Sequence, residues 1–190
     1  MKNLQIIIFI LVAFLSGNSV SFSQNKQDTK QYVCFPCGGG CDNTVYDSEG
    51  KCPVCGMPLI EKSRVKFKEI SPSGLLSKLH NEKGFVLLDV RTAAEFSGKG
   101  KGMRYLNGYK HLINSLNISS DELEKRIGEL SQYKDSEVIV YCSHSRRSPY
   151  SCQILTDAGF TNVTNLSGGI TEFMNEFLIN SNEGKSFLIK

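Results

Sequence analysis

The chain has 190 residues, of which 40% are hydrophobic, so it is long enough for one medium-sized domain with a buried core and a second, smaller one. Its formal net charge of +3 is too small to favour a nucleic-acid-binding protein, and no basic run interleaved with aromatic residues supports one. Composition leaves open an enzyme or a small-ligand-binding protein, and the local patterns decide between them.

Residues 1–23 are predicted to be an export signal. Lys2 is the only charged residue of this stretch, and residues 6–15 form an apolar run that is too short to span a bilayer comfortably. Ser21-Phe22-Ser23 fits a small-x-small cleavage site. We therefore expect an exported protein, periplasmic or secreted, that contacts a membrane only if the signal remains uncleaved as an anchor.

A polar linker at 24–31 is predicted to lead into a cysteine-rich module at 32–62. Four cysteines of the module form two CxxC pairs, Cys34–Cys37 and Cys52–Cys55. Two such pairs, with glycines beside them, can close a tetrahedral four-sulfur site for zinc or another soft metal ion. Because the module is too short for a hydrophobic core of its own, a structural metal would supply its folding free energy.

Two points about these cysteines stay open at the level of the sequence. In an exported protein, the same residues could pair as disulfides instead of binding a metal. Cys41 is a fifth thiol of the module, and it is either a substitute ligand or a free thiol.

Two segments of the module carry a family resemblance. Residues 32–34 read Tyr-Val-Cys, and residues 50–59 read Gly-Lys-Cys-Pro-Val-Cys-Gly-Met-Pro-Leu. They resemble the small heavy-metal-binding domain family, which implies a zinc-ribbon-like metal-binding unit. Cys37 stands where that family often has histidine, and a sulfur ligand in place of nitrogen suits zinc or cuprous copper.

From residue 63 onward, predicted strands and helices alternate. Apolar and β-branched runs predict strands at 65–70, 85–90, 112–118, 137–141 and 162–166. Helices are predicted at 72–80, 91–96, 119–130 and 148–157 and after Gly168-Gly169, with a capping box at Ser119–Glu122. The last ten residues are expected to pack lightly. This alternation predicts an α/β fold in which helices flank a parallel sheet and the active site lies at the carboxyl ends of the strands.

A basic, serine-rich loop follows the predicted strand 137–141. It reads Cys142-Ser143-His144-Ser145-Arg146-Arg147-Ser148 and leads into a helix whose first turn contains Pro149. Backbone N–H groups of such a loop can converge on one point, where the helix dipole and the two arginines add positive charge. We expect a thiol there to have a depressed pKa and to react as thiolate. The alternative is an unreactive cysteine that closes a core strand.

Several segments of this part of the chain also resemble one family. The matching residues are Leu87–Arg91 with Glu95-Phe96, His111–Ile118, Ala158–Val163 and Asn165–Ile170. Together with Cys142, four intervening residues and Arg147-Ser148, they resemble the rhodanese (sulfurtransferase) family over about residues 65–180. Ser143 and Ser145 depart from the arginine and glycine that the family often has, and Lys110 and Ile113 depart from its usual glycine and proline.

The resemblance implies a rhodanese-like domain at 63–190 that transfers sulfane sulfur through a persulfide on Cys142. Arg147 is the second catalytic residue, which orients an anionic donor and braces the loop. The predicted substrate-binding residues are Ser143, His144, Ser145, Arg146 and Ser148. The implied substrates are a small donor, such as thiosulfate or a persulfide, and a thiol or cyanide-like acceptor, with no organic cofactor.

Three other functions compete with this interpretation. Cysteine phosphatases of related architecture typically carry five residues between cysteine and arginine, whereas four separate Cys142 from Arg147, so a phosphatase is the weaker enzymatic alternative. The chain could instead be a metal-handling protein whose rhodanese-like part only binds or docks. It could also be a thiol oxidoreductase in which Cys41 or Cys152 resolves a disulfide with Cys142.

Overall fold

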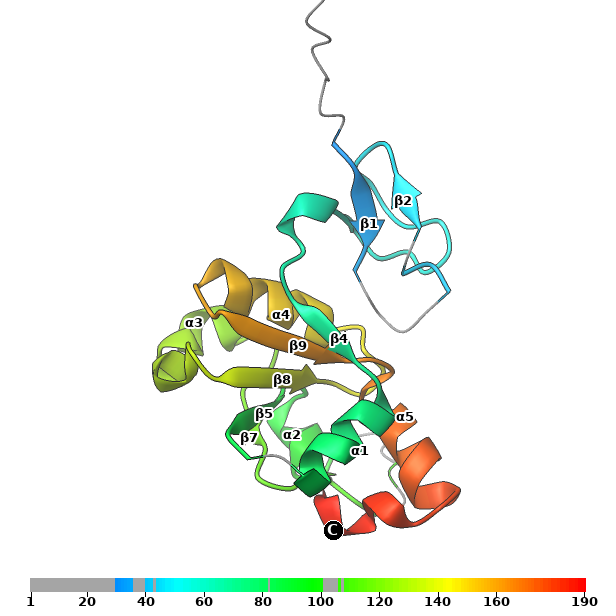
Figure 1. The fold of residues 1–190 in the computed structure, drawn as a ribbon, viewed down its shortest axis with the longest axis vertical. Helices are drawn as coiled ribbons and strands as arrows, with labels where there is room; N and C mark the ends of the chain where they lie inside the picture. Colours follow the sequence, from blue (N-terminus) through cyan, green and yellow to red (C-terminus); the bar gives the residue numbers. More distant parts are fainter. Residues whose placement is uncertain (1–29, 36–39, 43, 82, 101–105, 107) are drawn as a thin grey trace, which may run out of the picture.

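The structure is a computed structural model that describes residues 30–35, 40–42, 44–81, 83–100, 106 and 108–190. The predicted export signal, most of the predicted linker and Cys37 lie outside these residues. Figure 1 shows a small antiparallel unit near the N-terminus beside a larger α/β unit. None of the helices in the described part of the chain has the length and apolar character needed to span a bilayer.

A parallel five-stranded sheet organises the larger unit, with the strand order β4-β9-β8-β5-β7. The strands are β4 (Lys68–Ile70), β5 (Phe85–Asp89), β7 (Leu116–Asn117), β8 (Glu137–Tyr141) and β9 (Asn162–Leu166). Strand β8 takes the central place because its side chains are apolar on both faces, as a strand covered from both sides requires. The predicted α/β fold with a parallel sheet is confirmed.

Helices cover both faces of this sheet (Figure 1). They are α1 (Pro72–Asn81), α2 (Ala93–Phe96), α3 (Leu123–Arg126), α4 (Ser148–Asp157) and α5 (Gly169–Met174). Helices α3 and α4 share one apolar core with Val138 and Val140, whereas α1 and α5 share the opposite core with Ile139 and Tyr141. The described chain also has short 3-10 or π helices, labelled η1 (Lys62–Arg64), η3 (Ile127–Tyr133), η4 (Asn175–Ile179) and η5 (Glu183–Phe187).

The predicted strand at 112–118 is wrong as a single element. The chain forms two short strands, β6 (His111–Leu112) and β7, separated by a turn in which Asn114 has a φ of 57°. Strand β6 leaves the main sheet and pairs with β10 (Leu188–Ile189). The last ten residues are anchored through β10, where Leu188 is buried, while most of the others are exposed, as light packing implies.

The capping box predicted at Ser119 is also wrong. Helix α3 has Glu122 as its N-cap and no side-chain cap hydrogen bond, because Ser119 is buried at a turn and its carbonyl accepts the N–H of Glu122. The structure has a capping box at Thr92 and Glu95 instead, at the start of α2.

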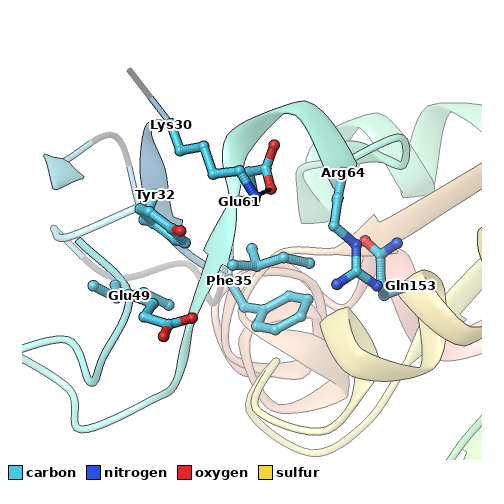
Figure 2. Close-up of a pocket in the computed structure, with 9 residues that line it drawn as sticks. Lys30, Tyr32, Phe35, Glu49, Glu61, Arg64 and Gln153 are labelled. Atoms are coloured by element: carbon cyan, nitrogen blue, oxygen red, sulfur yellow. Dashed lines mark ion pairs between the residues drawn. The ribbon is translucent and has the colours of Figure 1, made fainter. Parts of the chain in front are cut away.

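The N-terminal unit is a three-stranded antiparallel sheet of β1 (Tyr32–Cys34), β2 (Val45–Tyr46) and β3 (Leu59–Glu61), in the order β2-β1-β3. It packs on α4 through Phe35, whose ring centroid lies 4.2 Å from that of Tyr150. Figure 2 shows the pocket at this junction, with Tyr32 and Phe35 on one side and Arg64 and Gln153 on the other. Since Phe35 and Ile60 belong to the same apolar core as α4, the two units are packed together.

Candidate active site and thiol cluster

Cys142 stands directly after β8, at the carboxyl end of the central strand. It is 1% exposed, and the Ser148 hydroxyl donates a 3.6 Å hydrogen bond to its sulfur from the first turn of α4. The predicted position at the end of a strand, in front of a helix N-terminus, is therefore present. Cys142 also belongs to the apolar core that α3 and α4 share, so a substrate can reach its sulfur only if neighbouring residues move.

The first amides of α5 hold the carbonyl groups at the start of the loop. The N–H of Ile170 donates to the Cys142 carbonyl at 2.9 Å, and the N–H of Thr171 donates to the Ser143 carbonyl at 3.1 Å. This contact requires glycine at residue 169, because a Cβ there would lie 2.5 Å from the Cys142 carbonyl oxygen and the backbone has a φ of 64°. Helix α5 thus directs two loop carbonyls toward itself.

Several backbone N–H groups of the loop take no part in these hydrogen bonds with α5. The structure records no hydrogen bond from the backbone N–H of Ser145, Arg146 or Arg147 to another residue that it describes. A loop whose carbonyls are engaged on one side and whose amides are unbonded can bind an anion through those amides. Such a loop suits an anionic sulfur next to Cys142.

Arg147 is fixed in place by Glu95. Its two terminal nitrogens donate to the two carboxylate oxygens at 2.7 and 2.8 Å, and one of them also contacts the Ser143 hydroxyl at 3.1 Å. The Arg147 guanidinium, together with donors from Thr92, lowers the pKa of Glu95 to about 2. In turn, the pKa of Arg147 is raised mainly by Glu95, with a smaller contribution from Cys142, whose thiol lies beside it.

The remaining predicted substrate-binding residues fall into two groups. Ser143, Ser145 and Ser148 are buried within the loop, where their hydroxyls make the hydrogen bonds that shape it. His144 and Arg146 are exposed at its outer side. The exposed pair is therefore in a position to meet a substrate in solution, and the buried serines support the loop.

Three residues that the sequence analysis gave no role also support this site. Glu95 pairs with Arg147, and Asn165 donates to the Ser145 hydroxyl while its amide also contacts Glu69. The motif that contains Glu95 was visible in the sequence, but its partner lies 52 residues away in the chain. Asn165 also begins a matching segment, Asn165–Ile170, but that resemblance does not show its partners, and no local sequence signal identifies Glu69, which meets Asn165 through the pairing of β4 with β9.

A second sulfur site lies in the N-terminal unit. The sulfur atoms of Cys34, Cys41, Cys52 and Cys55 all lie within 4.8 Å of one another, as the sulfurs of a tetrahedral zinc site do at about 3.8 Å. Three of these residues are predicted ligands, and Cys41 is the thiol that the sequence left open. The fourth predicted ligand, Cys37, lies outside the described residues. The six described cysteines are all free, and no disulfide joins these four.

The protonation of these thiols fits a cation. Hydrogen bonds from the N–H of Cys55 and the Tyr46 hydroxyl lower the pKa of Cys52 to about 6. Burial, followed by the neighbouring sulfurs, raises the pKa of Cys34 and of Cys41. Burial and the crowding of sulfurs both disfavour the charged form of a thiol, and a cation among the four sulfurs would favour it. The donor set of four cysteines suits zinc or another soft metal ion, which would supply that charge.

Comparisons with known proteins identify two families in this chain. The family model "Rhodanese-like domain" matches residues 72–176, which is more than half of the chain. The chain belongs to the rhodanese-like family. The model "Heavy metal binding domain" matches residues 31–62, so a heavy-metal-binding module precedes the rhodanese-like domain.

Individual relatives are similar at low identity. A sulfurtransferase of Allochromatium vinosum is 30% identical over 102 residues, which cover 54% of this chain and 83% of the relative. A mitochondrial protein of Schizosaccharomyces pombe, whose name assigns it provisionally to the thiosulfate sulfurtransferases, is 30% identical over 92 residues, 48% of this chain and 65% of the relative. The crystal structure of a rhodanese-related protein from Thermoplasma volcanium is 26% identical and covers 58% of this chain and 93% of that one, with a TM-score of 0.46.

Proposed function

We propose that this protein is an exported sulfurtransferase that carries sulfane sulfur on Cys142. The observation that supports this most directly is the rhodanese-like loop itself. Its cysteine ends the central strand, its amides at Ser145 to Arg147 are unbonded within the described structure, and Glu95 fixes its arginine. The sulfurtransferase relatives agree with this chemistry.

The proposed reaction has two steps. The Cys142 thiolate attacks the outer sulfur of thiosulfate, a new S–S bond forms, and sulfite leaves with the electron pair of the broken S–S bond. The thiolate of an acceptor, or cyanide, then attacks the terminal sulfur, and Cys142 departs as thiolate. Loop amides stabilise the anionic sulfur in both steps, and Arg147 adds a fixed positive charge beside it.

In this proposal the N-terminal cysteines have a structural role. Zinc or another soft metal ion would be bound by Cys34, Cys41, Cys52 and Cys55 and would stabilise the module. The proposed reaction uses no organic cofactor. The predicted export signal places the protein in the periplasm or outside the cell. In that environment the four thiols would be open to oxidation, and a bound metal ion would protect them.

The oxidoreductase alternative receives less support from the geometry. Cys152 is fully buried inside α4, and burial raises its pKa well above the usual value of a thiol. Cys41 lies in the four-thiol cluster. Neither therefore has the exposed, ionised sulfur that a resolving cysteine needs.

Thiocyanate formation from thiosulfate and cyanide tests the proposal. Activity should vanish in Cys142→Ala and persist in Cys152→Ser, the matched control in the next helix. Mass spectrometry of the thiosulfate-treated protein should find about 32 Da added on the peptide that contains Cys142. A Cys142→Ala variant that still forms thiocyanate would refute the proposal, and a wild-type protein that takes up metal without sulfur transfer would favour the metal-handling alternative.

A further inference from the structure

Asn165 connects the active-site loop to the edge of the sheet. It lies in β9, where the strand register places it opposite Val140 of β8 on one side and Glu69 of β4 on the other. It is 0% exposed. A buried amide at this level of the sheet lies close to the point where β8 gives way to the loop, so its contacts bear on the shape of the loop.

The contacts of Asn165 use both hydrogens of its amide nitrogen. Nδ2 donates to the Ser145 hydroxyl oxygen at 2.7 Å and to the carboxylate oxygens of Glu69 at 3.0 and 3.1 Å. Burial raises the pKa of Glu69 to about 7, and above that pH its carboxylate accepts hydrogen bonds and repels a carbonyl oxygen, which favours this orientation of the amide. Ser167 donates to the same carboxylate at 2.5 Å, which holds Glu69 against the sheet.

The amide oxygen of Asn165 has no such partner. Oδ1 is buried and makes no hydrogen bond to any residue that the structure describes. Leaving a buried acceptor unbonded is unfavourable. The bonds of Nδ2 to Ser145 and Glu69 hold the side chain in this arrangement.

Ser145 explains what the bonds achieve. Its φ is 54°, a left-handed conformation that residues other than glycine rarely adopt. It is the single residue of 142–148, all of which the structure describes, with a positive φ. A loop needs such a residue if successive amides are to converge on one anion. A serine in this place therefore needs an external contact to hold it.

We infer that Asn165 is a positioning residue of the active site, which holds Ser145 in the left-handed conformation and keeps the loop amides directed at the sulfur of Cys142. Glu69 anchors Asn165 from the neighbouring strand. The inference rests on the proposed sulfur transfer for its catalytic meaning, but the structural role of Asn165 stands apart from it.

The test is a double-mutant cycle between Asn165 and Ser145. Asn165→Leu keeps the size of the side chain and removes both hydrogen bonds, so we expect kcat for thiocyanate formation to fall about tenfold or more. In the Ser145→Gly background the same substitution should have little effect, because glycine takes a positive φ without support. Thr164→Val is the matched control: its buried hydroxyl in the same strand has no partner in the described structure, and activity should be unchanged.

A second readout separates this inference from the proposed function. In Asn165→Leu, the amide NMR shifts of residues 143–148 should move, and in Asn165→Leu with Ser145→Gly they should return toward those of Ser145→Gly alone. Unchanged shifts and activity in Asn165→Leu, or an equal loss of activity in both backgrounds, would overturn the inference. If Asn165→Leu fails to fold, Glu69→Ala removes the anchor from an exposed position and should move the same amide shifts. A wild-type protein without sulfur transfer would refute the proposed function while the NMR outcome still decides the role of Asn165.

Discussion

The two sulfur sites of this protein are built in opposite ways. At Cys142, a single thiol lies in a loop. Three kinds of contact hold the shape of that loop: backbone hydrogen bonds from α5, an arginine paired with a glutamate, and a buried asparagine. In the N-terminal unit, four thiols converge within 4.8 Å on a small sheet with only short strands. The first site is shaped by a large core around it, and the second has little besides its own ligands.

This difference predicts different vulnerabilities. A site held by the tertiary structure should lose function when a supporting contact is removed, although the protein stays folded. A site held by its ligands should lose its structure when the metal is removed. Four kinds of substitution or treatment would test this contrast.

The largest effect is expected from metal removal. Chelation should unfold residues 30–62, because structural zinc contributes on the order of 10 kcal/mol to such modules. Cys41→Ser should lower the metal affinity by at least about 100-fold, since it removes one of four sulfur ligands. Titration with zinc, followed by hydrogen exchange of the module, measures both. Cys152→Ser, which changes a cysteine outside the module, is the control, and an unchanged affinity in Cys41→Ser would contradict the assignment of Cys41 as a ligand.

The next effect concerns the contact between the two units. Phe35→Ala removes a buried ring that packs on Tyr150 at 4.2 Å, and it should destabilise the protein by about 3 kcal/mol. Denaturant unfolding measures this loss. Val54→Ala, at an exposed position of the same module, should change the stability by less than about 0.5 kcal/mol.

Deletion of residues 24–62 tests whether the contact between the two units also affects activity. If sulfur transfer survives the deletion, the contact serves stability. If transfer is lost, the module and the active site are coupled.

A smaller cost in stability, with a large effect on activity, is expected at Gly169. Gly169→Ala places a Cβ against the Cys142 carbonyl and forces alanine into a positive φ, which together should cost about 2–3 kcal/mol. The rate of thiocyanate formation should fall even at temperatures where the variant is fully folded, because the loop is displaced. The melting temperature of the variant shows where that range ends. Gly128→Ala, where a Cβ meets open space, serves as the control. An active Gly169→Ala variant would show that the loop does not depend on α5.

The smallest effect is a pH-dependent one at Glu95. Its pKa is lowered to about 2 in the folded protein, so its contribution to stability is present above the unfolded value of about 4.5 and is lost as the pH falls from there toward 2. Glu95→Gln should therefore cost about 2 kcal/mol at pH 7, after allowance for partial exposure, and progressively less below pH 4.5. Urea unfolding of both proteins at pH 7 and pH 3.5 measures the difference. A cost that is independent of pH would exclude the ion pair with Arg147 as its source.

Local patterns in the sequence were enough for the main elements of the fold. The apolar run of β8 predicted a buried central strand, and the alternation of strands and helices predicted the parallel sheet. They failed where a short-range signal competed with a distant partner. The segment 112–118 has the composition of one strand, but the C-terminal residues at β10 pair with its first part and a turn at Asn114 divides it.

Sequence patterns alone were enough to identify the residues that we propose carry the chemistry: a cysteine between a strand and a helix, an arginine five positions later, and a cluster of cysteines with CxxC spacing. The contacts that hold these residues in place became visible in the folded protein alone. Glu95 acts on the loop through an ion pair from α2, and Asn165 and Glu69 act on it through neighbouring strands; each partner lies at least 20 positions away in the chain. Cys41 joins the cluster of sulfurs although it belongs to neither CxxC pair. Spacing encodes local backbone geometry, whereas these contacts depend on the positions of whole elements in space, which no local pattern records.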